Sequence, residues 1–137
     1  MEWKKDFCVG LSGIDEAHQD LANAVTGIEQ AVARGESSSA IAAAIELFIA
    51  QTRSHFNDEL TLMRVYDYPD IAAHIQDHKT FLSLLDNLRR TSVSKNTTHE
   101  DVAFLHTWLE QHLLSYDKVY YAHFARTWQP ALLAKQR

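Results

Sequence analysis

Histidine and carboxylate side chains stand on the apolar faces of predicted helices in this sequence. His55 and Glu59 are four residues apart, and so are His74 and His78. Residues four apart on a helix project from nearly the same side, one turn from each other. Because a buried carboxylate is costly unless something pairs with it, this spacing indicates either a hydrated helix face or a bound cation.

Each predicted helix face carries at least one histidine, and two carboxylates accompany them. The set is His18, His55, Glu59, His74, His78, His112 and Asp117. Taken singly, such residues are usually solvated or hydrogen-bonded without metal. Burying all of them at one level without metal would leave roughly a dozen polar atoms to satisfy in a small core. Metal ligation satisfies them together, so the set predicts a metal site.

The kinds of donor narrow the choice of metal. Imidazole combined with carboxylate suits iron, zinc, copper or nickel, and disfavours calcium or magnesium. Seven protein ligands are too many for one ion, which takes about four to six. Two ions bridged by the carboxylates therefore fit better.

Long amphipathic helices must position these residues. Apolar residues recur at intervals of three and four along four segments, about 15–33, 40–66, 70–91 and 98–128. Turn signals separate the segments: Gly35 before a run of serines, Tyr68-Pro69-Asp70, and a polar stretch over 91–98. Thr97 and Glu100 have capping-box spacing for the start of the fourth helix. We therefore expect an all-α, up-down-up-down antiparallel four-helix bundle, crossed by an extended N-terminal arm at 1–13.

The composition is that of one ordinary globular domain, 1–137, with 46% hydrophobic and 23% charged residues. A net charge of −5 gives no basic footprint for nucleic acid, and no apolar run approaches membrane-spanning length. Cys8 is the only cysteine, which excludes a disulfide framework and a thiolate metal site. Without a signal peptide, a cytoplasmic location is the default expectation.

The spacing of the candidate ligands resembles the hemerythrin family, specifically its bacterial branch. The pattern consists of His18, His55-x-x-x-Glu59, His74-x-x-x-His78 and His112-x-x-x-x-Asp117. Flanking residues agree: Trp3, Val9-Gly10, Ile14-Asp15, His55-Phe56, Leu62-Met63, Tyr68-Pro69 and Trp108-Leu109. The resemblance covers about residues 3–124 and fills all seven ligand positions.

This resemblance implies a non-haem di-iron centre that binds dioxygen reversibly. One iron would be held by His74, His78 and His112, and the other by His18 and His55. An oxo or hydroxo group and the two carboxylates, Glu59 and Asp117, would bridge the two iron ions. On two six-coordinate irons this leaves one position open, on the iron with two histidines, and ligand binding needs such a position.

The family pattern also implies an apolar oxygen pocket, although ordinary core packing explains its members equally well. Its walls would be Leu21, Phe56, Trp108, Leu109 and Leu113. The remaining candidate histidines, His99, His106 and His123, are expected to be surface or capping residues.

Asp117 is the ligand position that helical spacing alone does not favour. It follows His112 by five residues, which on an ideal helix turns it about 140° away. Either a local π-bulge or the reach of a bridging carboxylate could correct the difference.

The sequence alone does not determine what the protein does with bound oxygen. The chain could be an oxygen carrier or store, or an oxygen- or redox-sensing domain whose end at 130–137 leads to a C-terminal output domain or signalling partner. A third reading is a di-iron enzyme with oxidase, peroxidase or nitric oxide chemistry. No catalytic residue is apparent beyond the ligands, so binding without catalysis is the first expectation.

Overall fold

The computed structural model describes the backbone of residues 5, 12–94, 97–117, 120 and 122. These residues form four α-helices, a π-helix and no strand. The helices are α1 (Ser12–Ala33), α2 (Ser38–Val65), α3 (Ile71–Ser94) and α4 (His99–Gln111), and α4 continues into the π-helix η2 (His112–Asp117).

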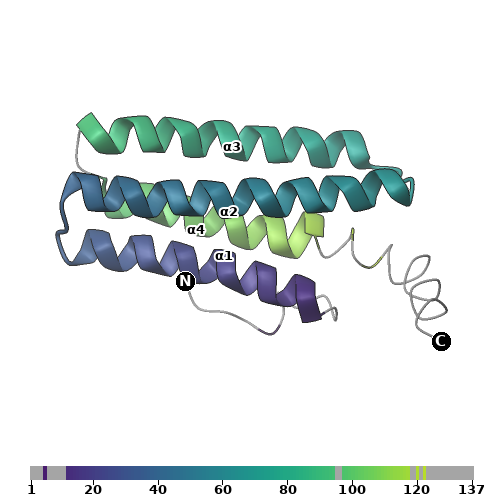
Figure 1. Ribbon diagram of the computed structural model, residues 1–137, viewed down its shortest axis with the longest axis horizontal. Coiled ribbons are helices and arrows are strands. Elements are labelled where there is room, and N and C mark those ends of the chain that lie inside the picture. The colour runs from purple at the N-terminus through teal and green to yellow at the C-terminus, as the bar shows by residue number, and fades with distance from the viewer. Residues whose placement is uncertain (1–4, 6–11, 95–96, 118–119, 121, 123–137) are drawn as a thin grey trace.

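Successive helices run side by side in opposite directions (Figure 1). α2 packs against both α1 and α3, and α1 also packs against α4. The predicted all-α antiparallel four-helix bundle is confirmed. No helix among the described residues combines the length and apolar character that crossing a bilayer requires.

The turn between α1 and α2 follows from local sequence. Gly35 has a φ of 66°, a left-handed conformation that glycine adopts without a steric penalty. The Ser37 hydroxyl then accepts a hydrogen bond from the backbone N–H of Ala40 at 3.2 Å and caps α2. The predicted stop and start signals are therefore the ones that the chain uses here.

The start of α4 differs from the prediction by one residue. The capping box pairs Thr98 with Asp101, not Thr97 with Glu100. The Thr98 hydroxyl accepts from the Asp101 N–H at 3.2 Å, and the Asp101 carboxylate accepts from the Thr98 N–H at 2.9 Å. Asp101 thus takes the place that glutamate or glutamine usually holds in this motif.

Two predicted boundaries also need correction. α3 extends to Ser94, so the first half of the expected loop over 91–98 is helical. α1 begins at Ser12, so Ser12 and Gly13 belong to the helix and not to the arm. Most of the arm, and most of the fourth helix beyond 117, lie outside the described residues.

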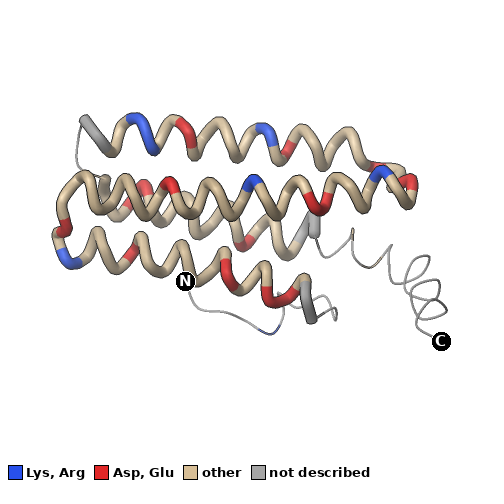
Figure 2. Tube along the Cα trace, viewed as in Figure 1, with Lys and Arg blue, Asp and Glu red and all other residues tan. Residues whose placement is uncertain are grey.

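The buried apolar residues form two clusters with a polar layer between them. The larger cluster lies among all four helices and includes Phe48, Phe81 and, nearest the layer on α2, Phe56. The smaller cluster contains Met63, Tyr68 and Tyr120. Charged residues of both signs are spread along α2 and α3 (Figure 2). The polar layer between the clusters is where the candidate ligands meet.

Candidate metal centre

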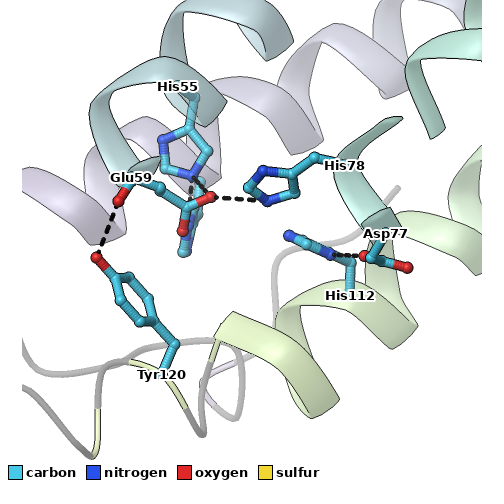
Figure 3. A network of polar contacts seen from close by, with 7 residues as sticks. His55, Glu59, Asp77, His78, His112 and Tyr120 are labelled. Carbon is cyan, nitrogen blue, oxygen red and sulfur yellow. Dashed lines mark hydrogen bonds and ion pairs between the residues drawn. The ribbon is translucent and has the colours of Figure 1, made fainter. Parts of the chain in front are cut away.

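Glu59 lies at the centre of the polar layer and is only 1% exposed. Its Oε1 lies 3.5 Å from Nε2 of His55, one turn earlier on α2, and 3.3 Å from Nε2 of His78 on α3 (Figure 3). The i, i+4 spacing on α2 and the antiparallel packing of α3 bring these three groups together. A buried carboxylate therefore faces imidazoles from two helices.

Three more histidines, from α1, α3 and η2, complete the layer. His18 on α1 is fully buried, and its Nε2 lies 2.9 Å from Nε2 of His55. His74 on α3 and His112, the first residue of η2, are each 2% exposed. All four sides of the bundle thus direct a buried imidazole toward one level.

The donor atoms of these residues fall into two groups, and within each group they lie within 4.8 Å of one another. One group is Glu59, His74, His78 and His112, and the other is His18, His55 and Glu59. Glu59 belongs to both. Five imidazoles and a shared carboxylate at these separations form a donor set that fits two transition-metal ions side by side. The histidines divide in the way that the family resemblance implies.

Asp117 occupies the last position of η2. In a π-helix the backbone hydrogen bonds join residues five apart, so residue 117 lies about one turn beyond His112 on the backbone. The helix thus has the local geometry that the five-residue spacing requires. The structure describes the backbone of Asp117 but not its side chain, so its role as a second bridging ligand stays a prediction.

Aromatic rings stack on two of the candidate histidines, His78 and His112. Phe56 stacks on His78 with ring centroids 3.6 Å apart and planes 3° apart. Trp108 stacks on His112 at 4.7 Å and 13°, and on Phe81 at 3.5 Å and 7°. Two of the predicted pocket residues, Phe56 and Trp108, therefore contact candidate ligands directly.

The other predicted pocket residues are Leu21, Leu109 and Leu113, all of which belong to the larger core cluster. Each is at most 2% exposed. Their burial is consistent with an apolar oxygen pocket beside the metal centre, and equally with ordinary core packing.

Two residues near the site have roles that the sequence patterns did not reveal. Asp77 Oδ2 lies 2.7 Å from Nδ1 of His112. The Tyr120 hydroxyl donates a hydrogen bond to the backbone carbonyl of Glu59 at 3.2 Å (Figure 3). Only one sequence feature pointed to Asp77: it lies between His74 and His78, at the edge of the helix face that carries both histidines.

The histidines expected to be bystanders lie apart from the donor groups where the structure describes them. His99 is the exposed first residue of α4. His106 is half-buried, 3.5 Å from Glu29 and 3.6 Å from Glu110. His123 lies outside the described residues.

Comparison with known proteins gives an independent assignment. Residues 9–124 match the hemerythrin HHE cation binding domain. A bacteriohemerythrin of Pseudomonas aeruginosa is 29% identical over 119 residues, which cover 86% of this chain and 77% of that protein. A bacteriohemerythrin of Ralstonia nicotianae is 24% identical, covering 87% of this chain and 85% of the relative. A myohemerythrin of Theromyzon tessulatum is also 24% identical, covering 87% and 89%. The matched region contains the whole layer of buried histidines, and the chain belongs to the hemerythrin family.

Proposed function

We propose that this protein binds dioxygen reversibly at a non-haem di-iron centre. Membership of the family implies oxygen binding at a metal centre. The observation that carries the proposal for this chain is that Glu59 belongs to both donor groups, because a shared carboxylate is the feature that a two-metal site needs and a single-metal site does not. Its ligands would be His18, His55, Glu59, His74, His78, His112 and Asp117.

The donor set supports iron over zinc as the resident metal. Structural zinc sites are almost always four-coordinate with protein ligands alone. With Glu59 and Asp117 as bridges that count for both ions, one ion here would have five protein donors and the other four, and a position for an exogenous ligand would come in addition. Imidazole and carboxylate donors without thiolate suit non-haem iron. When bound, the iron pair supplies two electrons to dioxygen and recovers them on release.

The unequal division of histidines supports a position for dioxygen on one side of the pair. The group with His18 and His55 has one imidazole fewer than the group on α3 and η2. An open coordination position on that side leaves room for an exogenous ligand. The buried residues around that position would keep bulk water away, and Glu59 would contribute a carboxylate to both ions.

The proposed use of this binding is oxygen carriage or storage, or oxygen sensing on behalf of an output partner. Stopped-flow measurement of oxygen release and autoxidation separates the two roles. Fast release with slow autoxidation would support a carrier or store, whereas rapid autoxidation would support a sensor. Sustained turnover of peroxide or nitric oxide would instead support an enzyme.

The purified protein is expected to take up two iron ions per chain. We expect a visible charge-transfer absorption on exposure to oxygen that disappears when oxygen is removed, because reversible binding returns the iron pair to its ferrous state. Metal analysis together with absorption spectra under alternating argon and oxygen tests this. A protein that holds a single zinc ion and shows no such band would rule out the di-iron proposal.

Removal of the metal is expected to destabilise the bundle. A ligand present at a thousand times its Kd stabilises the folded state by about 4 kcal/mol, so chelation should lower the thermal midpoint markedly. His74→Ala deletes a buried donor and should make the midpoint nearly insensitive to chelator. Differential scanning calorimetry with and without chelator measures the shift.

The matched control is His106→Ala, which removes a histidine outside both donor groups. Its midpoint should respond to chelator as strongly as that of the unmodified protein. An equal response in His74→Ala would contradict the assignment of His74 as a ligand.

A further inference from the structure

The imidazole ring of His112 is held by residues that belong to neither donor group. Its Nδ1 lies 2.7 Å from Oδ2 of Asp77, the separation of a charge-assisted hydrogen bond in which the ring N–H donates to the carboxylate. A proton on Nδ1 leaves the lone pair of the neutral ring on Nε2. Figure 3 shows Asp77 on the outer side of this ring and His78 on the side of the donor group.

We propose that Asp77 is a positioning residue for His112. Its carboxylate selects the ring tautomer and orientation that present Nε2 to the metal, and it does so before any metal arrives. The inference rests on the proposed function only in taking His112 as a metal ligand.

The burial of the pair supports this role. The side chain of His112 is 2% exposed and that of Asp77 is 18% exposed. The carboxylate can therefore keep contact with water through part of its surface while one oxygen holds a buried ring. A fully buried carboxylate would add a large desolvation cost, which this arrangement avoids.

The position of His112 in the chain explains why its ring needs such support. The residue stands where α4 ends and the π-helix η2 begins, so the usual helical register changes at this point. Trp108 stacks on one face of the ring at 4.7 Å, which fixes the ring plane but not the identity of the protonated nitrogen. The hydrogen bond that Nδ1–H donates to Asp77 supplies that second constraint.

The contact also joins two helices at the metal level. Asp77 and Phe81 are four apart on α3, and they contact His112 and Trp108, which are four apart on the last helix. Carboxylates that hydrogen-bond a ligating histidine fix its orientation and raise its basicity, and their loss typically weakens metal binding about 10–100-fold. Asp77 is placed to do the same for the three-histidine group.

Two variants of Asp77 test the proposal. Asp77→Ala removes the acceptor at a partly exposed helical position where alanine maintains the fold, and Asp77→Glu restores a carboxylate. We expect Asp77→Ala to weaken the binding of Fe²⁺ about 10–100-fold, measured anaerobically in competition with a chromogenic chelator. Asp77→Glu should recover part of that loss.

A second measurement uses the metal-free protein. Ring ¹⁵N chemical shifts of His112 should show a protonated Nδ1 and an unprotonated Nε2 in the unmodified chain. In Asp77→Ala this preference should be lost, giving shifts typical of mixed tautomers. A merely structural role for Asp77 would leave these shifts unchanged.

Asp86→Ala is the matched control, since it removes another α3 carboxylate, whose partner Arg53 lies at 3.2 Å on the surface. Unchanged ring shifts in Asp77→Ala would overturn the proposal, whatever happens to metal affinity, and so would an equal loss of affinity in Asp86→Ala. If the unmodified protein takes up no iron, the proposed function fails, whereas the ring shifts still decide whether Asp77 sets the tautomer of His112.

Discussion

Glu59→Gln is expected to abolish the two-metal centre while the four helices stay folded. Glutamine has nearly the same shape as glutamate, but its neutral amide is a poor metal ligand and cannot bridge two ions. Glu59 is the one described residue that both donor groups share, so its loss affects both ions at once. Metal content after anaerobic reconstitution should fall from two ions per chain to one or none, and the oxygen-dependent absorption should disappear.

The matched control is Glu46→Gln on the same helix. Glu46 has a side chain 62% exposed and pairs with Arg89 at 3.7 Å on the surface, so this change should leave both ions in place. Circular dichroism of the metal-free forms verifies that each variant is still helical. Two ions retained by Glu59→Gln would mean that the carboxylate does not bridge them.

The meeting of Glu59 and His78 could be predicted from sequence because a short turn sets the register of α2 against α3. Glu59 lies nine residues before Tyr68, and His78 lies ten residues after it. Both helices rise about 1.5 Å per residue, so an antiparallel hairpin places the two residues at the same level. The spacing of apolar residues shows which face of each helix points inward. The position of the turn shows which residues of the two faces lie opposite each other.

The register at the end of the last helix could be anticipated but not decided from sequence. His112 and Asp117 are five apart, and an α-helix would separate them in angle whereas a π-helix aligns them. Both helix types satisfy the same backbone groups, so the choice depends on what the surrounding side chains make favourable. The structure resolves the backbone as the π-helix η2.

The contact between Asp77 and His112 is of a kind that sequence patterns do not reveal. It joins residues 35 apart on different helices, at the edge of the ligand face and not on it. Helical periodicity sorts residues into inner and outer, but an edge residue can turn its side chain either way. Only the packing of α3 against the last helix determines that Asp77 reaches the ring.

Phe56→Ala is expected both to destabilise the protein and to speed its autoxidation. Phe56 is 5% exposed, stacks on His78 at 3.6 Å and lies 6.3 Å from the ring of His55, so it contacts a histidine of each donor group. On its outer side, a surface hollow of about 230 Å³ between α2 and α3 is lined by Phe56 and His78. Without the phenyl ring this hollow would extend to the donor atoms and admit water.

Removing a buried phenylalanine side chain costs about 3–5 kcal/mol of stability, which urea denaturation of the metal-free protein would show. Water beside the bound oxygen promotes its loss in reduced form, so the autoxidation rate should rise in Phe56→Ala and change much less in Phe56→Leu, which keeps apolar cover. Phe104→Ala, at a position 52% exposed, should change neither quantity. A loss of stability with an unaltered autoxidation rate would identify Phe56 as a packing residue alone, because only a barrier to water links its ring to the lifetime of bound oxygen.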